Sequence, residues 1–379
     1  MRVGVDATPL LGRVTGIGVY TREILRALAA APSDPSEPSA PSAAADEVVA
    51  TAFTLRGAGQ LDEVVPPGVS GRARPVPARG LRAAWSWTEW PTVDLLCGPV
   101  DVFHATNFML PPPGRAAGVL TVHDLAYLTF PETVSAASRA NRELVPRGLA
   151  RARVVVTPSA AVAEQVRDAY AWPQDRVVAT PLGVDAAWGH ARPAAAEWLA
   201  AHDIPTTYLL AVGTLEPRKN LQALVRAHRD LADRHADIPP LVLVGGTGWG
   251  EALRLDGVRP GAVRLTGHLP IDELRSLVAG AQALVFPSLD EGFGLPPLEA
   301  LACGVPVLAS DLPVTREVLG DQALFCDASD PEALRHGLME TLADPVGTPA
   351  TRRGRAGGFT WQRCARLTRE AYARALALA

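Results

Sequence analysis

The chain has 379 residues, of which 48% are hydrophobic and 20% are charged, and its formal net charge is -4. This length favours two domains over a single core, and the charge excludes a broad basic surface for duplex nucleic acid. The four cysteines, Cys97, Cys303, Cys326 and Cys364, include no Cys-x-x-Cys pair, so we expect reduced thiols in the cytosol rather than a zinc site or a disulfide framework.

Short β-branched runs alternate with helical stretches along the chain. Strands are expected, in chain order, at residues 3–5, 48–52, 100–103, 119–122, 154–156, 208–212, 241–244, 263–265, 283–287 and 305–308. This alternation is typical of parallel sheets with helices on both faces, and the length accommodates two doubly wound sheets. No signal peptide precedes the first strand and no apolar run is long enough to cross a bilayer, so any membrane contact is expected to be peripheral.

Three segments indicate how the chain divides. Residues 31–42 are rich in Pro and Ser and poor in apolar side chains, which predicts a mobile surface loop. A strand exits into a glycine turn around 181–185, so we expect a first domain over 1–185 and a second over 186–360. An amphipathic helix is expected over 361–379, and we expect it to pack back on the first domain.

Two glycines, Gly16 and Gly18, follow the first strand at the start of an apolar-periodic helix. Their lack of side chains would let a phosphate approach the helix N-terminus. The Gly-x-Gly-x-x-Thr pattern lacks the third glycine of the dinucleotide fingerprint, and a turn that serves only helix–strand packing is the alternative.

The segment 72–90 combines arginines with the indoles of Trp85, Trp87 and Trp90. This composition suits anionic head groups or a polyprenyl diphosphate. The alternative is an ordinary helix face whose rings belong to the core.

Polar side chains follow two expected strands of the first sheet. His104 and Asn107 come at the end of the strand near 100–103, and His123 follows the strand 119–122. The carboxyl ends of parallel strands form the edge where doubly wound domains bind ligands, so all three are candidate ligand contacts. For His123, capping or packing is the alternative.

The loop 213–220 places two cations beside a helix start. Arg218 and Lys219 precede Asn220, which can cap the helix expected from Leu221. Two cations beside exposed helix N–H groups can bind an anion. Taken alone, the Arg–Lys pair would indicate a solvated turn.

The stretch 288–299 carries two glutamates eight residues apart. Glu291 follows the apolar run 283–287, and Glu299 is expected in the first turn of a helix that a Pro-Pro pair opens. Two intervening glycines let main-chain N–H groups point at an anion. This pattern suits a phosphorylated sugar donor, and a pair of exposed carboxylates is the alternative.

Together these motifs resemble those of the family 4 glycosyltransferases, over nearly the full length of the chain. The resemblance rests on Thr15–Gly18, His123-Asp124, the loop 213–220, Gly245-Gly246 and the stretch 291–311. It implies the GT-B fold, an α/β architecture in which two doubly wound, Rossmann-like domains face a cleft. It also implies a retaining transfer of a sugar from a nucleotide diphosphate sugar, with no metal and no cofactor, the donor lying mostly on the C-terminal domain.

The resemblance also assigns roles to residues. Glu291 would accept hydrogen bonds from sugar hydroxyls, Glu299 would hold the ribose hydroxyls, and Arg218 and Lys219 would neutralise the departing diphosphate in place of a metal. Main-chain amides would meet sugar or phosphate oxygens, and further side chains would contact the transferred sugar or the acceptor. These remaining positions are Gly16 and Gly18 for a donor phosphate, Phe293, Gly294 and Leu295 for the amides, His123 for the sugar, and His104 and Asn107 for the acceptor.

The donor sugar is expected to be mannose from GDP-mannose, because the form Gly-Phe-Gly-Leu-Pro-Pro-Leu-Glu resembles many mannosyltransferases of the family. A UDP- or dTDP-sugar is the alternative. The acceptor is expected to be a hydroxyl of a glycan, a lipid-linked molecule or a small molecule. A dinucleotide-dependent oxidoreductase and a non-catalytic sugar-nucleotide-binding module are the two readings from other functional classes, and the altered glycine loop argues against the first.

Overall fold

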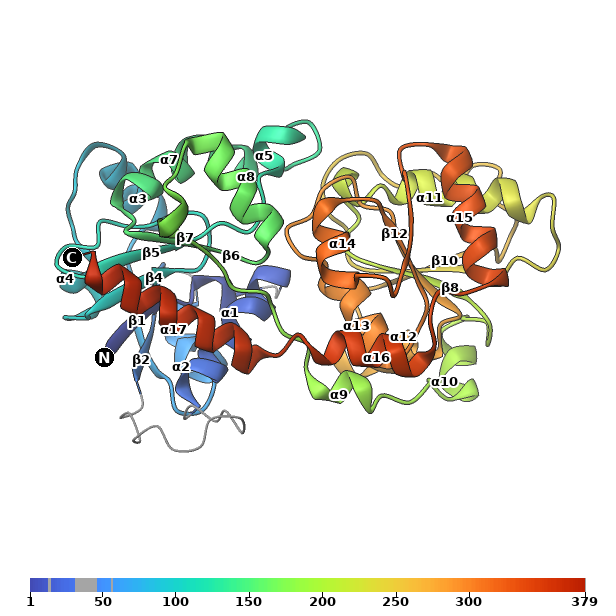
Figure 1. Ribbon diagram of the computed structural model, residues 1–379, viewed down its shortest axis with the longest axis horizontal. Helices are drawn as coiled ribbons and strands as arrows, with labels where there is room; N and C mark the ends of the chain where they lie inside the picture. The colour runs from blue at the N-terminus through green and yellow to red at the C-terminus, as the bar shows by residue number, and fades with distance from the viewer. Residues whose placement is uncertain (13–14, 31–45, 56, 379) are drawn as a thin grey trace. The chain divides into compact units, whose positions relative to one another are not determined.

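The structure, a computed structural model, describes residues 1–12, 15–30, 46–55 and 57–378 (Figure 1). The chain forms two compact units. Unit 1 comprises Met1–Leu125, Ala140–Gly183 and Thr360–Ala379, and unit 2 comprises Ala126–Arg139 and Val184–Phe359. The expected boundary at 185 assigned residues 126–139 to the first domain, whereas the structure groups them with unit 2. The Pro- and Ser-rich segment 31–42 lies outside the described residues.

Unit 1 is built on a parallel seven-stranded sheet with the order β3-β2-β1-β4-β5-β6-β7. Its strands are β1 (Arg2–Asp6), β2 (Glu47–Phe53), β3 (Ser70–Arg74), β4 (Val102–Ala105), β5 (Ala117–Thr121), β6 (Val154–Thr157) and β7 (Val177–Ala179). The central strands β4, β5 and β6 are buried along their whole length. Burial on both faces explains why, apart from His104, they consist of apolar or β-branched residues rather than alternating polar and apolar ones.

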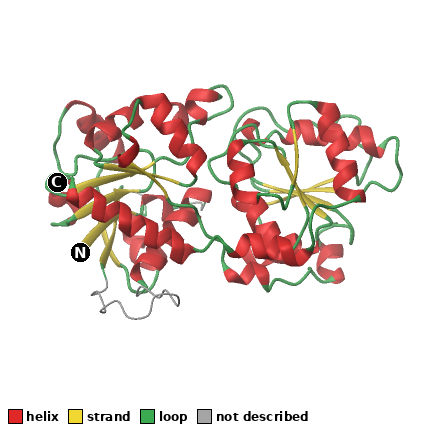
Figure 2. Ribbon diagram, viewed as in Figure 1, coloured by secondary structure: helices red, strands yellow, loops and turns green. Residues whose placement is uncertain are grey.

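Helices cover the faces of this sheet (Figure 2). They are α1 (Gly16–Ala29), α2 (Leu61–Val64), α3 (Ala78–Trp87), α4 (Val93–Cys97), α7 (Asn141–Arg151), α8 (Ala160–Tyr170) and α17 (Trp361–Ala377), with 3-10 turns η1 (Thr8–Leu10), η2 (Ala58–Gln60) and η3 (Gln174–Arg176). The C-terminal α17 packs against α1 and the strands β5 to β7. Its buried face includes Cys364, Thr368 and Tyr372, at the spacing of an amphipathic helix.

Unit 2 is built on a parallel six-stranded sheet with the order β10-β9-β8-β11-β12-β13. Its strands are β8 (Leu209–Val212), β9 (Leu241–Val244), β10 (Val263–Gly267), β11 (Ala283–Phe286), β12 (Val307–Ser310) and β13 (Leu324–Cys326). Its longer helices are α11 (Leu221–Ala232), α12 (Ile271–Gly280), α13 (Leu295–Cys303), α15 (Pro331–Ala343) and α16 (Pro349–Gly357). Its shorter helices are α5 (Ala126–Thr129), α6 (Ala136–Arg139), α9 (Ala186–Gly189), α10 (Ala196–Ala201) and α14 (Pro313–Leu319), and it has one 3-10 turn among the described residues, η4 (Pro217–Lys219). One apolar core joins β8, β9 and β11 to α11 and α15.

The two doubly wound parallel sheets expected from the sequence are confirmed, and every expected strand is present. Three strands were not expected: β3, β7 and β13. All three lie at a sheet edge and are only partly buried. An edge strand needs no continuous apolar run, because one of its sides has no neighbouring strand, and β3 carries two arginines.

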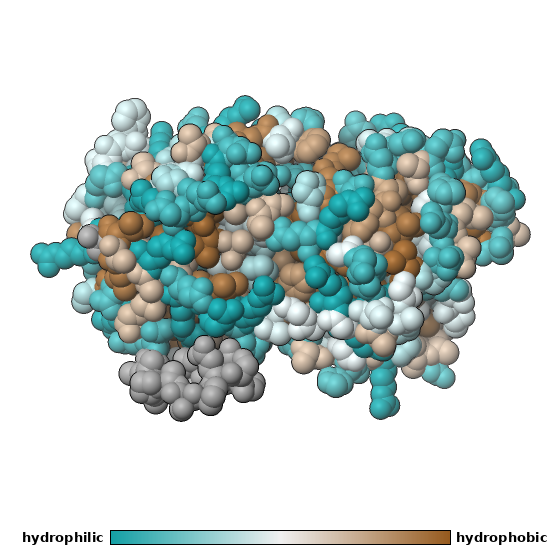
Figure 3. All heavy atoms as spheres, viewed as in Figure 1, coloured by the Kyte–Doolittle hydropathy of each residue, from teal (hydrophilic) through white to brown (hydrophobic). Residues whose placement is uncertain are grey.

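On the face drawn in Figure 3, hydrophilic residues cover most of the surface and hydrophobic residues occupy smaller areas between them. Within the described ranges, no helix combines the length and the apolar character that crossing a bilayer requires.

Candidate functional site

Two loops of unit 2 leave the carboxyl ends of neighbouring strands. The loop 213–220 follows β8, the loop 287–294 follows β11, and β8 pairs directly with β11. The backbone amide of Leu289 donates to the carbonyl of Arg218 at 2.9 Å, which joins the two loops. This is the edge at which doubly wound sheets place their ligands.

The two loops bring Glu291 together with both predicted cations. The ammonium of Lys219 lies 2.5 Å from Glu291 Oε1, and Arg218 Nη1 lies 3.1 Å from Oε2. Arg218 also donates from Nη2 to Glu216 Oε1 at 3.0 Å and from Nη1 to the carbonyl of Asp290 at 2.7 Å. The predicted convergence of these loops is therefore present as an ion-paired cluster, and Glu216 is a member that the sequence did not suggest.

Burial and nearby positive charge shift the pKa values of the carboxyl groups in this cluster in opposite directions. Burial alone would raise the pKa of Glu291, but the ion pairs with Lys219 and Arg218 outweigh it and lower the pKa to about 2. Burial raises the pKa of Glu216 above its usual value, against the opposing effect of Arg218. Glu291 is thus held as a charged acceptor in a site where only 8% of its side chain is exposed.

Lys219 is the only lysine in the 379 residues; the other members of the 36 Lys and Arg residues are arginines. Its ammonium lies 5.2 Å from the centroid of the Phe286 ring, at the end of β11. A lysine offers a compact point charge where a guanidinium is broad and planar. That the chain has a single lysine, next to Arg218 in this loop, is a sequence signal that distinguishes position 219.

The N-terminus of α13 follows Glu291 directly. Gly294 has φ +95, a left-handed conformation that favours glycine, and it precedes the first helical residue, Leu295. No described residue accepts a hydrogen bond from the amides of Phe293, Gly294 or Leu295. Three successive N–H groups at a helix N-terminus can receive negatively charged oxygens.

Glu299 lies in the second turn of α13, since the helix begins at Leu295, so the expectation that it lies in the first turn is wrong. Within the described residues its carboxylate forms no hydrogen bond or ion pair. Burial raises its pKa to about 8, opposed by the nearby charge of Arg275. A carboxyl group in this state can both donate and accept hydrogen bonds.

Asn220 does not cap α11 as expected. Its backbone is left-handed with φ +53, and its side-chain amide donates to the carbonyl of Ala328 at 2.8 Å. Asn220 therefore ends the turn η4 and ties the cation-bearing loop to the chain after β13.

Gly245 and Gly246 hold the β9 loop against the β8 loop. A Cβ atom on Gly245, which has φ +154, would lie 1.8 Å from the carbonyl oxygen of Gly213. The amide of Leu215 donates to the carbonyl of Gly246 at 3.0 Å. A side chain is excluded at position 245 because the two backbones touch there, which explains the first glycine of the Gly-Gly motif.

In unit 1, His123 follows β5 and is 9% exposed. Its Nε2 donates to the carbonyl of Thr106 at 2.7 Å, and the edge of its ring contacts Tyr20 of α1. Burial lowers its pKa below the usual value. A neutral imidazole that donates from Nε2 keeps Nδ1 as an acceptor, and no described residue donates to Nδ1.

His104 has a different role from the one predicted. It is fully buried, its Nδ1 lies 2.7 Å from the hydroxyl of Tyr372 and its Nε2 lies 2.7 Å from Oγ1 of Thr121. Burial lowers its pKa to about 3. Because both ring nitrogens are used inside unit 1, His104 ties α17 to the sheet and is not available to an acceptor.

The remaining predicted positions of unit 1 lie near strand ends. Asn107 is exposed just beyond β4. Gly16 and Gly18 form the first turn of α1, Gly18 buried and Gly16 exposed, and a Cβ atom on Gly16 would meet nothing within 4 Å. Packing within the described residues therefore does not require a glycine at position 16.

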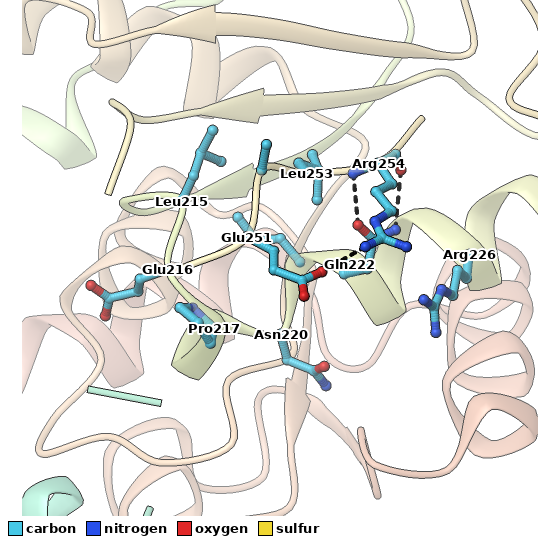
Figure 4. Close-up of a pocket in the computed structure, with 11 residues that line it drawn as sticks. Leu215, Glu216, Pro217, Asn220, Gln222, Arg226, Glu251, Leu253 and Arg254 are labelled. Carbon is cyan, nitrogen blue, oxygen red and sulfur yellow. Dashed lines mark hydrogen bonds and ion pairs between the residues drawn. The ribbon is translucent and has the colours of Figure 1, made fainter. Parts of the chain in front are cut away.

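A pocket of about 330 Å³ adjoins the β8 loop (Figure 4). Its wall includes Glu216, Gln222, Arg226 and Arg254, but none of the predicted site residues. Gln222 is hydrogen-bonded to the backbone of Arg254, while Glu216 points away from both, in keeping with its pair to Arg218. The pocket and the Glu291 cluster therefore share Glu216, whereas Glu291, Arg218 and Lys219 do not line the pocket.

In the ranges that the structure covers, no three His, Cys, Asp or Glu side chains lie close enough together to hold a metal ion.

Comparison with known families and proteins identifies relatives for both units. Residues 15–183 match the family described as "Glycosyl transferase 4-like domain", and residues 206–344 match "Glycosyl transferases group 1". The chain is 34% identical over 281 residues to the O-antigen chain mannosyltransferase B of Escherichia coli, which covers 72% of this chain and 74% of that protein. A shorter match, 34% over 144 residues, covers 37% of this chain and 40% of the O-antigen chain mannosyltransferase RfbU of Salmonella typhimurium.

Solved structures of similar architecture cover nearly the whole chain. Sucrose-phosphate synthase from Thermosynechococcus elongatus matches with a TM-score of 0.72 at 19% identity, covering 100% of both chains. Anabaena HepE in complex with UDP matches with a TM-score of 0.65 at 15% identity, covering 97% of this chain and 98% of that one. At these identities the likeness concerns the fold alone.

Proposed function

The chain belongs to the group 1 glycosyltransferases and has the GT-B fold, and from this premise we propose that it transfers mannose from GDP-mannose to a hydroxyl acceptor, with retention at the anomeric carbon. The observation that carries the proposal is the buried cluster in which Glu291 pairs with Lys219 and Arg218 beside three amides without acceptors. This arrangement offers a carboxylate for sugar hydroxyls, and cations and N–H groups for phosphate oxygens.

The ion pairs suggest how the cluster responds to a donor. A diphosphate competes with Glu291 for Lys219 and Arg218, because its oxygens are equally good partners for both cations. Glu291, released from these pairs, then accepts hydrogen bonds from the sugar hydroxyls. The two cations neutralise the charge that grows on the departing diphosphate, which is the kind of stabilisation that acts in the transition state.

The other predicted residues complete the donor site. The amides of Phe293, Gly294 and Leu295 meet sugar or phosphate oxygens, and Glu299 binds the ribose hydroxyls with its otherwise unpaired carboxyl group. In unit 1, the free Nδ1 of His123 accepts a hydrogen bond from the transferred sugar, and Gly16 and Gly18 leave room for a donor phosphate at the start of α1.

No metal ion or cofactor is part of this proposal. Lys219 and Arg218 supply two positive charges where a divalent cation would otherwise balance the diphosphate. Attack on the sugar is assisted by the leaving phosphate, since no protein carboxylate is assigned as the base.

Mannose as the sugar rests on the relatives, because the O-antigen chain mannosyltransferase B of Escherichia coli matches most of this chain at 34% identity. A UDP- or dTDP-sugar is the second candidate donor. HepE was solved with UDP, but at 15% identity that structure supports the fold and not the base.

The acceptor is a hydroxyl of a glycan, a lipid-linked molecule or a small molecule, and Asn107 is its remaining predicted contact in unit 1. We place the enzyme in the cytoplasm, with peripheral contact at the inner face of a membrane. The Arg- and Trp-rich segment 72–90 supports this contact.

A thermal-shift panel of GDP, UDP, ADP and dTDP tests the donor. A ligand present at 100 times its Kd stabilises the folded state by about 2.7 kcal/mol. Of the four nucleotides, only GDP should therefore raise the unfolding temperature clearly. A selective shift with UDP or dTDP would replace GDP-mannose in the proposal. Mannosyl transfer should also persist in a chelator, and a strict requirement for magnesium would contradict the role given to Lys219 and Arg218.

The single lysine offers a direct test of where the nucleotide binds. Among the side chains of these 379 residues, an amine-selective reagent can modify only Lys219, and peptide mass spectrometry distinguishes that product from modification of an N-terminal amine. GDP should slow modification of Lys219 and leave that of the N-terminal amine unchanged. Equal rates with and without GDP would place the nucleotide away from the cluster.

A further inference from the structure

Two polar side chains of unit 1, those of Asp6 and Thr51, are buried toward the carboxyl edge of its sheet. Asp6 is the last residue of β1, and Thr51 of β2 is its partner in the register of the two strands. Apart from Arg2 and Glu47 at their amino ends, the two strands carry no other polar side chains. Asp6 and Thr51 therefore lie near the edge at which doubly wound sheets bind ligands.

The hydroxyl group of Thr51 has no partner in the part of the chain that the structure describes. The residue is 0% exposed, and its Oγ1 neither donates nor accepts a hydrogen bond there. Buried side-chain hydroxyls are almost always hydrogen-bonded, and an unpaired one destabilises the fold. A threonine at this position is therefore unfavourable unless a ligand or a water molecule binds its hydroxyl.

The carboxyl group of Asp6 is only partly satisfied. It is 9% exposed, Oδ1 accepts from the backbone amide of Thr8 at 2.9 Å, and no described residue other than Thr8 forms a hydrogen bond or an ion pair with it. Burial raises the pKa of Asp6 above its usual value, whereas the hydrogen bonds from Thr8 and the charge of Arg82 act in the opposite direction. A carboxylate has about four acceptor positions, so Asp6 can accept further hydrogen bonds.

Both side chains point to the face of the sheet that α3 covers. Residues paired in this register share a face, and Phe53, two residues after Thr51, shares it as well. The ring of Phe53 contacts Trp85 of α3, with 6.0 Å between the centroids, and the charge of Arg82 on the same helix acts on Asp6. Neighbouring strands lie about 4.8 Å apart, so the carboxyl and hydroxyl groups are spaced to contact one small polar molecule.

A chain of hydrogen bonds connects this pair to the residue proposed to meet the transferred sugar. Thr106, directly after β4, donates from Oγ1 to the carbonyl of Asp6 at 2.6 Å, and its own carbonyl accepts from Nε2 of His123 at 2.7 Å. In the sheet, β4 separates β1 from β5, which ends two residues before His123. Two strand spacings amount to roughly 10 Å, so Asp6 and Thr51 lie beside the position of the transferred sugar, where the molecule that receives it would bind.

We propose that Asp6 and Thr51 bind neutral sugar hydroxyls of the acceptor, Asp6 as an acceptor of hydrogen bonds and Thr51 as a donor or acceptor. This inference rests on the proposed function and deepens it, because it gives the acceptor a chemical class, a saccharide. It also gives the acceptor site two residues beside Asn107, in place of His104. A carboxyl group next to a hydroxyl group can bind neighbouring hydroxyls of one sugar, whereas the carboxylate would repel a phosphate group.

Transfer from GDP-mannose to simple glycosides tests the proposal. The probes are the methyl α-glycosides of mannose, glucose, galactose and N-acetylglucosamine, and the best acceptor among them is used for every variant. Asp6→Asn keeps an oxygen for the amide of Thr8 but loses the charge. It should raise the KM for the acceptor at least about tenfold, because hydrogen bonds to charged groups are the stronger ones.

Thr51→Val should raise the KM for the acceptor about fivefold. It should leave the unfolding temperature unchanged or raise it, because an apolar group of the same shape replaces a hydroxyl without a partner. Thr368→Val is the matched control, since Thr368 is also fully buried in unit 1 but its hydroxyl donates to the carbonyl of Cys364 at 2.8 Å. The control should lower the unfolding temperature and keep the KM for the acceptor.

An unchanged acceptor KM in both Asp6→Asn and Thr51→Val would overturn the proposal and leave a buried water molecule as the partner of the pair. A lower unfolding temperature in Thr51→Val would also overturn it, because the hydroxyl would then have a partner within the fold. So would transfer to none of the four glycosides by a parent protein that hydrolyses GDP-mannose.

Two donor-side measurements separate this proposal from the proposed function. Both variants should keep the thermal shift with nucleotide and the rate of donor hydrolysis without acceptor. Loss of either in the variants would assign the pair to the donor and overturn its assignment to the acceptor. Absence of both in the parent protein would contradict the proposed function itself.

Discussion

The strand ends of the two units both bury ionisable side chains, but unit 1 buries neutral histidines and unit 2 buries charges. In unit 1, burial lowers the pKa values of His104 and His123, and both nitrogens of His104 and Nε2 of His123 are hydrogen-bonded to neutral groups. In unit 2, Glu291 stays ionised because Lys219 and Arg218 lie against it. One unit avoids the cost of burying charge, and the other offsets that cost by pairing.

Neutral histidines and ion-paired charges suit different ligands. Neutral hydrogen-bonding groups recognise sugar hydroxyls without attracting phosphate, whereas a paired cluster holds cations ready for an anion that can displace the carboxylate. We therefore expect the charged contacts to phosphate to come from unit 2, whereas unit 1 would meet a phosphate only through the start of α1. The following substitutions test that expectation, beginning with the largest expected effect.

Lys219→Ala should lower kcat by a factor on the order of 100, since removing one preorganised donor costs about 3 kcal/mol in the transition state. The measurement is steady-state transfer with the donor that the thermal shifts identify. Arg218→Ala should have an effect of similar size. Lys219→Arg keeps the charge and should lose less activity than Lys219→Ala. Normal turnover by both alanine variants would remove the cluster from the mechanism.

Gly245→Val should destabilise the protein by about 3 kcal/mol, because the valine side chain would clash with the backbone of Gly213 in the loop that carries Arg218 and Lys219. The effect should appear as a lower midpoint of thermal unfolding and as weaker nucleotide binding. Gly354→Ala in α16 is the control, since its Cβ atom would meet nothing within 4 Å. That change should be neutral or stabilise by about 0.5 kcal/mol. Tolerance of valine at 245 would show that the two loops can separate without consequence.

His104→Leu should destabilise the folded state by about 2 kcal/mol, because it leaves the hydroxyls of Tyr372 and Thr121 without their buried partner. Its kcat per folded molecule should stay near that of the parent. His123→Ala should give the reverse result, with a folded protein that transfers sugar at least about tenfold more slowly. A selective rise in the KM for acceptor in His104→Leu would restore the original assignment of His104 to acceptor binding.

Glu299 should make stability depend on pH in a direction opposite to that of Glu291. Its folded-state pKa of about 8 lies above the ordinary value of 4.5, so the folded state binds more protons between these pH values and stability falls as pH rises through them. Glu291, with a pKa lowered to about 2, contributes stability above pH 4.5 that is lost as pH falls toward 2. Glu299→Gln should therefore flatten the decline in unfolding temperature between pH 5 and 8. An unchanged slope would mean that Glu299 ionises freely.

Most of the sheet architecture could be predicted from the sequence, because central parallel strands are buried on both faces and show it as continuous apolar runs. The edge strands β3, β7 and β13 could not, because partial burial leaves no such signature. The convergence of Glu291 with Arg218 and Lys219 also followed from sequence, since loops at the carboxyl ends of parallel strands meet at one edge.

The sequence by itself thus determined the two doubly wound sheets and the edge that carries the cations and the first glutamate of the site. Only the tertiary structure decided the partners of these polar groups: Arg218 donates to the carbonyl of Asp290, Asn220 donates to the carbonyl of Ala328, and His104 is hydrogen-bonded to Tyr372 of α17. Local patterns report burial and backbone preference, whereas the partner of a buried polar group depends on which distant segment packs against it. The tertiary fold therefore determines the partner, because a buried polar group needs a hydrogen-bond partner but its local sequence does not specify which one.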